Sequence, residues 1–195
     1  MGWEEVGRAV RGVRSPVDAP IIRQTYTESG VDPLPDGVLV VQQRVFPDDS
    51  GGSFKEVVRL DSNGIVEAPQ LRERGIALKP AQLNVSLVAP GARRFWHVHP
   101  EQCELWTISH GQLNAGVIDC REGSPSYGKR ARVILTSHSG LYIPAGVAHG
   151  FANESSALVV LHYLVDHQFS RGEDSQEWRI SPEVLDYQFV LAETI

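Results

Sequence analysis

From residue 38 onward, the chain is divided into short runs rich in Val, Ile, Leu and Phe, separated by turn-forming residues such as Asp61–Gly64 and Gly123–Pro125. Such runs fit a pleated sheet surface, in which successive side chains point to opposite faces. The pattern predicts nine strands, over Val38–Val45, Phe54–Leu60, Gln82–Val88, Phe95–His99, Glu104–Ser109, Leu113–Ile118, Arg132–Leu135, Leu141–Ile143 and Leu158–Val165. We therefore expect an all-β chain, folded as a sandwich or a barrel. The jelly-roll barrel is the variant that encloses a ligand cavity between its sheets.

The two ends of the chain differ from this pattern. Residues 1–36 carry four prolines and scattered charges without a sustained period, which predicts an N-terminal arm suited to contact between subunits. Residues 170–195 are rich in charge, and we expect a short C-terminal tail that packs on the barrel through Trp178 and Tyr187. The barrel itself is expected over residues 37–169. A chain of 195 residues with 42% hydrophobic content can bury one core of this kind.

The net charge and the short apolar runs argue against two classes of partner, nucleic acids and membranes. A formal net charge of -6 and a pI near 5.6 argue against nucleic acid, which is bound through clustered Lys and Arg. The longest apolar runs, such as Leu158–Leu161, are too short to cross a bilayer, and the first thirty residues lack the apolar core of a signal peptide. We expect a cytoplasmic protein with neither a nucleic-acid nor a membrane partner.

Two histidines and a carboxylate stand close together in the segment 91–111. His97 and His99 are two residues apart, so both imidazoles point to the same face of a strand and can reach one ion. Pro100 cannot extend a central ladder, so we expect the chain to turn there and to bring Glu104 inward on the next strand, with Trp106 on the same face.

A third histidine follows a second turn. Pro144 and Gly146 set a tight corner that delivers His149 to the mouth of the barrel. Three imidazoles and one carboxylate form a mixed nitrogen and oxygen site, which suits Mn, Fe, Ni, Co or Zn better than Mg or Ca. An octahedral ion would keep two positions open for a substrate oxygen, water or dioxygen, as a catalytic site requires.

These residues resemble the motifs of the cupin superfamily. The pattern G-x5-H-x-H-x4-E-x6-G is matched at every defined position, by Gly91, His97, His99, Glu104 and Gly111. The second motif, P-x-G-x2-H-x3-N, is matched by Pro144, Gly146, His149 and Asn153. The resemblance implies a cupin jelly-roll β-barrel that binds a divalent metal through four ligands, which are His97, His99, Glu104 and His149.

A narrower resemblance, over roughly residues 46–169, is to the dTDP-4-dehydrorhamnose 3,5-epimerases and their sugar-nucleotide relatives. The segments that agree, in the family's order, are Phe46–Asp48, Phe54–Glu56, Gln82–Ser86, Arg94–His97, Gln102, Asp119–Gly128 and Ala148–Phe151. The resemblance implies a small-molecule substrate of the sugar-nucleotide class. It also implies carbohydrate metabolism as the setting.

The departures from that family create the metal site. His99 stands where the family has Gln, and Glu104 stands where it has Lys. The family's epimerases work without metal, with a histidine at the position of His97 as base and a tyrosine on a later strand as acid. A ligated His97 has no lone pair left for a proton. We therefore expect an epimerase or isomerase in which the metal polarises the keto group.

Three further residues are candidates for catalysis. Arg94 is by resemblance a contact for a phosphate or an enolate. The family's tyrosine position falls on His162, with Tyr163 next to it, and because strand neighbours point to opposite sides either one could face the cavity.

The sequence is also compatible with two other functions. An Fe(II)-type dioxygenase uses a similar ligand set, and a sugar-binding cupin would keep the pocket without turnover. By analogy with related cupins, we expect a homodimer formed by strand exchange at the barrel edge.

Overall fold

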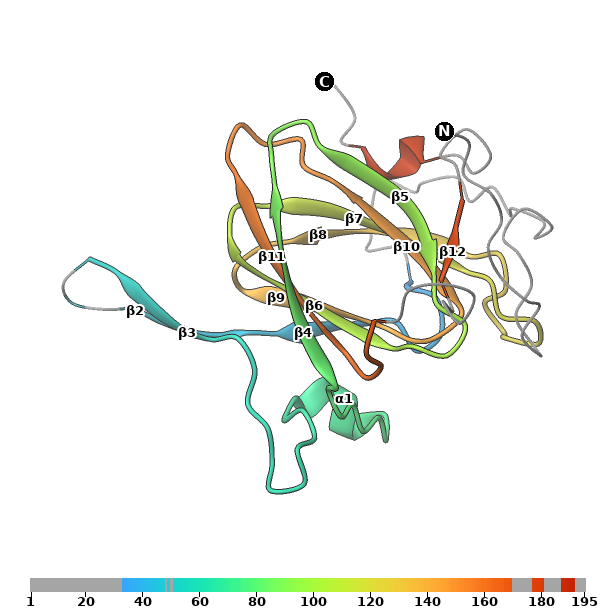
Figure 1. Ribbon diagram of the computed structural model, residues 1–195, viewed down its shortest axis with the longest axis horizontal. Coiled ribbons are helices and arrows are strands. Elements are labelled where there is room, and N and C mark those ends of the chain that lie inside the picture. Colours follow the sequence, from blue (N-terminus) through green and yellow to red (C-terminus); the bar gives the residue numbers. More distant parts are fainter. Residues whose placement is uncertain (1–32, 48, 50, 170–176, 181–186, 192–195) are drawn as a thin grey trace.

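The computed structural model describes residues 33–47, 49, 51–169, 177–180 and 187–191 (Figure 1). Most of the predicted N-terminal arm and much of the C-terminal tail lie outside these residues. The strands are β1 (Leu39–Gln42), β2 (Arg44–Pro47), β3 (Ser53–Glu56), β4 (Gln82–Val88), β5 (Arg93–Val98), β6 (Glu104–His110), β7 (Leu113–Asp119), β8 (Arg130–Leu135), β9 (Ser139–Ile143), β10 (Val147–Ala152), β11 (Val159–Val165) and β12 (Trp178–Arg179). A short helix α1 (Pro69–Glu73) and a 3-10 turn η2 (Gln188–Val190) complete the described elements.

Ten of the strands form two five-stranded sheets that face each other. One sheet has the order β1-β9-β6-β11-β4, and the other has the order β12-β5-β10-β7-β8. Neighbouring strands are antiparallel in both sheets. Strands β2 and β3 form a separate hairpin that projects from the barrel (Figure 1). The all-β jelly-roll prediction is confirmed.

The main core lies between the two sheets, where inward-facing residues such as Ile108, Leu113, Leu141 and Leu161 are almost completely buried. These residues come from alternate positions of the strands, because every second side chain of a strand points inward. Outside one sheet, Leu71 of α1 packs under β1 and β6 together with Leu105. No helix in the described part of the chain is long and apolar enough to cross a membrane.

The strand prediction missed β10. All six of its residues are buried, but His149 and Gly150 interrupt the sequence Val-Ala-His-Gly-Phe-Ala, so it is not an apolar run of the kind that identified the other strands. The burial follows from its place, because β10 lies between β5 and β7. Gly150 is needed there, since a Cβ at this residue would lie 2.6 Å from the carbonyl oxygen of Arg94.

Other boundaries also differ from the prediction. The expected strand Val38–Val45 is divided into β1 and β2 at Gln43, whose N–H donates to the carbonyl of His138. The expected strand Phe54–Leu60 is reduced to the end of a hairpin. The helix α1 was not predicted at all, and it begins with Pro69 in its first turn, a position where the missing N–H has no cost.

Candidate active site

A cavity of about 400 Å³ opens between the two sheets. This volume lies within the range of small-molecule sites. Both sheets contribute to its wall, and so do the segments that follow β5 and β11. Its lining residues include Gln82, Asn84, Ser86, Arg94, His97, His99, Gln102, Glu104, Trp106, His149, Tyr163, Phe169, Glu177 and Arg179.

Three of the four predicted metal ligands converge in this cavity. The ligand atoms of His99, Glu104 and His149 all lie within 4.8 Å of one another. Nε2 of His99 is 3.1 Å from Oε1 of Glu104, and Nε2 of His149 is 3.7 Å from Oε2 of the same carboxylate. His149 lies in β10 and His99 directly follows β5 in one sheet, whereas Glu104 begins β6 in the other. The group therefore bridges the two sheets.

Glu104 is a buried carboxylate that is held ionised. Burial disfavours its charged form, but the imidazoles of His149 and His99 keep the pKa of Glu104 below its ordinary value. Two neutral donors also contact it, because Nε2 of Gln102 donates to Oε1 at 2.7 Å and Nε1 of Trp106 donates to Oε2 at 2.5 Å. The carboxylate is thus charged, buried and fixed in direction.

His149 and Glu104 are oriented so that a cation could bind between them. Burial lowers the pKa of His149 to about 4, so its ring is neutral near pH 7. The ring nitrogen Nδ1 lies 3.0 Å from the Val147 carbonyl and donates its proton there, which leaves a lone pair on Nε2. That lone pair faces a carboxylate oxygen, and two acceptors face each other favourably only with positive charge between them. Metal-bound histidines are oriented in the same way, by donating the other ring N–H to a carbonyl.

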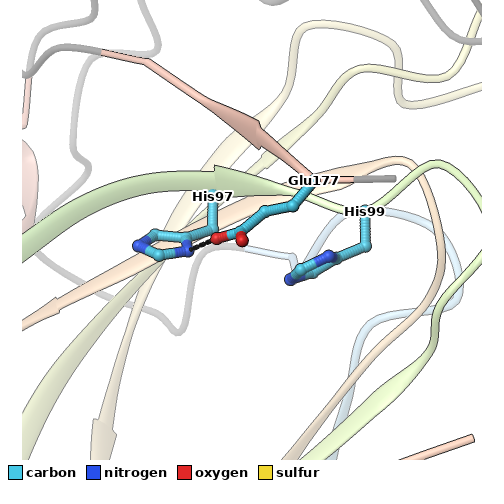
Figure 2. Close-up of side chains that lie close together, drawn as sticks. All are labelled: His97, His99 and Glu177. Carbon is cyan, nitrogen blue, oxygen red and sulfur yellow. Dashed lines mark hydrogen bonds and ion pairs between the residues drawn. The ribbon is translucent and has the colours of Figure 1, made fainter. Parts of the chain in front are cut away.

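His97, the fourth predicted ligand, has a different partner. Its Nδ1 is hydrogen-bonded to Oε1 of Glu177, and the second group of possible ligand atoms in the described residues joins His97, His99 and Glu177. Figure 2 shows the Glu177 carboxylate against the side of the His97 ring that faces His99, with the other ring nitrogen on the far side. The ring centroids of His97 and His149 are 6.2 Å apart, against 5.3 Å for His99 and His149. The structure therefore does not bring all four predicted ligands into one group.

Sequence reasoning did not identify Glu177. Strand β12 pairs with β5, with Arg179 opposite His97, and residues two apart in a strand share a face, so Glu177 and Arg179 both turn toward the cavity. Trp178 between them is buried in the core behind the sheet. Nε and Nη2 of Arg179 each donate to the Glu177 carboxylate at 3.0 Å. Burial opposes ionisation of Glu177, but the hydrogen bonds to His97 and Arg179 lower its pKa to about 2. The only signal in the sequence was the alternation Glu-Trp-Arg.

Of the three candidates for catalysis, the structure places two in the wall of the cavity and one outside it. Arg94 lines the cavity, with its guanidinium carbon 5.6 Å from the centre of the Phe151 ring. Tyr163 also lines the cavity. His162 lies on the opposite face of β11 because strand neighbours alternate, and there its Nε2 is 2.9 Å from Oγ of Ser109.

Comparison with known proteins agrees with this architecture. The family described as dTDP-4-dehydrorhamnose 3,5-epimerase matches residues 34–185, which is most of the chain. The chain belongs to this family. The dTDP-4-dehydrorhamnose 3,5-epimerase family is one of enzymes, and the resemblance that the sequence motifs indicated is confirmed.

Individual members of the dTDP-4-dehydrorhamnose 3,5-epimerase family are moderately similar. A dTDP-4-dehydrorhamnose 3,5-epimerase of Streptomyces griseus is 29% identical over 153 residues, which cover 76% of this chain and 72% of the relative. The enzyme of the same name from Sinorhizobium fredii is 33% identical over 143 residues, covering 70% and 68%. A solved structure of a dTDP-6-deoxy-D-glucose-3,5-epimerase from Legionella pneumophila, in complex with dTDP-4-keto-L-rhamnose, has a TM-score of 0.64 at 25% identity and covers 83% of this chain and 80% of its own.

Proposed function

We propose that this chain epimerises a nucleotide-linked 4-keto sugar, with His97 as the base. The observation that carries the proposal is the hydrogen bond between His97 and Glu177 on the wall of the cavity. Family membership supports the substrate class, and the cavity volume supports a sugar-sized ligand.

The hydrogen bond to Glu177 prepares His97 for proton transfer. A proton on Nδ1 that is donated to the carboxylate leaves the lone pair on Nε2, and the carboxylate also stabilises the imidazolium that forms when Nε2 takes a proton. A carbon next to a ketone is acidic enough for this step. Its C–H bond breaks, an N–H bond forms on His97, and the electron pair moves into an enolate.

Two other residues would complete the reaction. Tyr163 belongs to β11 in the sheet opposite to β5, so its hydroxyl can deliver a proton to the other face of the enolate carbon. Return of a proton from the opposite face inverts that carbon. Arg94 would hold the negative charge of the enolate or of the diphosphate, since its guanidinium presents a planar fork of N–H donors.

We further propose that His99, Glu104 and His149 hold a divalent metal ion. The support is the lone pair of His149 that faces the Glu104 carboxylate, in a group whose members also include His99. Such an ion would supply Lewis-acid polarisation of the keto oxygen, which lowers the cost of the enolate. His97 is left out of this set, so that its lone pair stays available for the proton.

Exchange of ring hydrogens with solvent tests the epimerase proposal. The purified protein is incubated in deuterated water with a dTDP-4-keto-6-deoxy sugar, and deuterium at the ring carbons is followed by mass spectrometry. We expect incorporation by the wild type, a fall of roughly 10²–10⁴-fold in H97N, and a smaller fall in E177Q.

The variant H138N is the matched control for H97N, because His138 lies at an exposed turn. Its exchange rate should equal that of the wild type. Absence of deuterium at every ring carbon, with Mn²⁺, Co²⁺ or Zn²⁺ added or with none, would contradict the proposal.

A second function is favoured by one observation. Two histidines and one carboxylate are the ligand set of non-haem Fe(II) oxygenases, and His99, Glu104 and His149 have this composition. Iron in the purified protein together with oxygen uptake on a sugar substrate would favour that function. Tight substrate binding without exchange or oxygen uptake would instead favour a binding-only cupin.

We also propose that a second copy of the chain covers the projecting hairpin and β4. Phe46 and Phe54 stack on the hairpin with ring centroids 6.0 Å apart, and both are exposed. Strand β4 ends its sheet, and its outward side chains Leu83, Val85 and Leu87 are each more than half exposed. A lone hairpin is only marginally stable, and an apolar edge strand favours pairing. A homodimer would cover both features at once.

A further inference from the structure

Glu104 is contacted by two neutral donors that the proposed reaction does not use. Gln102 precedes strand β6, and Trp106 lies two residues after Glu104 on the same face of that strand. The amide of Gln102 donates to Oε1 at 2.7 Å, and the indole N–H of Trp106 donates to Oε2 at 2.5 Å. Each carboxylate oxygen therefore has one neutral donor of its own.

These two donors fix the orientation of the Glu104 carboxylate, and thereby the directions in which its other lone pairs point. An ionised carboxylate offers about four lone-pair sites. Gln102 and Trp106 take one site on each oxygen, and the imidazoles of His99 and His149 face Oε1 and Oε2. An ion can therefore bind Glu104 without the loss of either donor.

Trp106 also contacts a second member of the group. Its ring meets the His149 ring edge-on, at an interplanar angle of 87° and a centroid distance of 5.3 Å. The indole is buried, so it cannot move away from this position without opening a cavity. One side chain therefore sets the direction of both Glu104 and His149.

We propose that Gln102 and Trp106 are positioning residues that orient Glu104 toward a divalent metal ion. This inference rests on the metal-ion part of the proposed function. Partners that hydrogen-bond a metal ligand set its orientation, and their loss weakens metal affinity by roughly 10–100-fold. Gln102 acts through Glu104, Trp106 acts through Glu104 and His149, and neither would be a ligand of the ion.

Metal affinity tests the inference without any assay of turnover. Chelator-treated protein is titrated with Co²⁺, and binding is followed by calorimetry and by the visible absorption bands of the bound ion. We expect W106F and Q102L each to weaken Co²⁺ binding by roughly 10–100-fold and to change the shape of the absorption bands. Q102L keeps the inference testable if W106F fails to fold, which circular dichroism of the metal-free protein will report.

The matched control for Q102L is Q168L. Gln168 lines the same cavity but makes no hydrogen bond to Glu104 within the described residues, so its loss should leave Co²⁺ affinity unchanged. Wild-type affinity in both W106F and Q102L, or tighter binding, would overturn the inference and leave the metal site standing. A wild-type protein that binds no Co²⁺ would overturn both, whereas the deuterium experiment judges the epimerase proposal separately.

Discussion

His162 and Tyr163 are neighbours in β11, yet they lie in different surroundings. Tyr163 pairs with Trp106 of β6 and lines the cavity, whereas His162 contacts Ser109 on the outer face of the same sheet. Burial and the positive charge of Lys55 lower the pKa of His162, so it is neutral near pH 7. An alignment without gaps cannot distinguish the two residues, but the pleat of the strand does.

The first prediction uses this pair. Y163F should lower solvent exchange at one ring carbon by roughly 10²-fold or more, because the acid that protonates the enolate is lost. H162F should exchange at the wild-type rate, since its side chain is outside the cavity. Mass spectrometry of the recovered sugar after incubation in deuterated water measures both. Equal loss in the two variants would contradict the assignment.

Asp119 is a second residue whose role follows from its partners. It is completely buried, and it accepts hydrogen bonds from Arg121, Ser124 and Ser126. Burial alone would raise the pKa of Asp119, but these donors hold it below its ordinary value of 3.8. The residue fixes the loop between β7 and β8.

The second prediction concerns stability and pH. D119N should lower the free energy of unfolding by roughly 1.5–3 kcal/mol near neutral pH, which is the worth of hydrogen bonds to a charged group. Because the folded pKa is depressed, this stabilisation is present above about pH 4 and is lost as pH falls through the folded pKa. Urea denaturation at pH 7 and at pH 3 measures it, and the two proteins should differ less at the lower pH.

At the scale of elements, β12 is short but it completes the site. Its two residues pair with β5, and the N–H groups of Trp96 and Ile180 each donate to the other residue's carbonyl. Trp178 and Ile180 are buried against Trp96, Val98 and Ile118 on the side away from the cavity. The strand thereby presents Glu177 and Arg179 to His97.

The third prediction tests whether β12 supports catalysis by His97 rather than the stability of the whole barrel. W178A should lower deuterium exchange as far as E177Q does, because β12 loses its anchor and His97 loses its carboxylate. A buried Trp to Ala change typically costs roughly 3–5 kcal/mol. We expect a smaller loss here, since so short an edge strand can detach while the barrel stays folded. Urea denaturation and the exchange assay together measure it, and wild-type exchange would contradict the role of β12.

The candidate site could be predicted from the sequence only where its residues lie in motifs. His97 and His99 are two apart, Glu104 follows a turn, and His149 follows another, so local rules indicated that these four are chemically active. Gly111 of the first motif is explained too, because it has a φ of 86° and a Cβ there would lie 2.8 Å from Val159. The partner of His97 could not be predicted. Eighty residues separate Glu177 from it, and only strand pairing brings them together.

At the scale of the whole molecule, the sequence supported an all-β fold and a cavity between sheets. Runs of apolar residues identified most strands, among them β4 and β8, in which one face is buried and the other is more exposed. The patterns did not indicate that β5 and β6, consecutive in the chain, belong to opposite sheets. Because the chain passes from one sheet to the other between β5 and β6, Glu104 and the histidines lie on facing walls of the cavity.

The fourth prediction concerns assembly. F54D should shift the protein from dimer to monomer, because a buried carboxylate opposes contact between the hairpin and a second copy. I134D is the control, since Ile134 is also exposed but lies on β8 in the other sheet. Light scattering coupled to size-exclusion chromatography measures the mass. A wild-type protein that is monomeric would contradict the prediction.

Because His99 and His149 belong to one wall and Glu104 to the other, an ion held among them would cross-link the two halves of the sandwich. The halves could not then separate without releasing it. Saturation at about a hundred times the dissociation constant would add about 2.7 kcal/mol to the folded state. Melting temperature would thus rank candidate ions by affinity before any substrate is known.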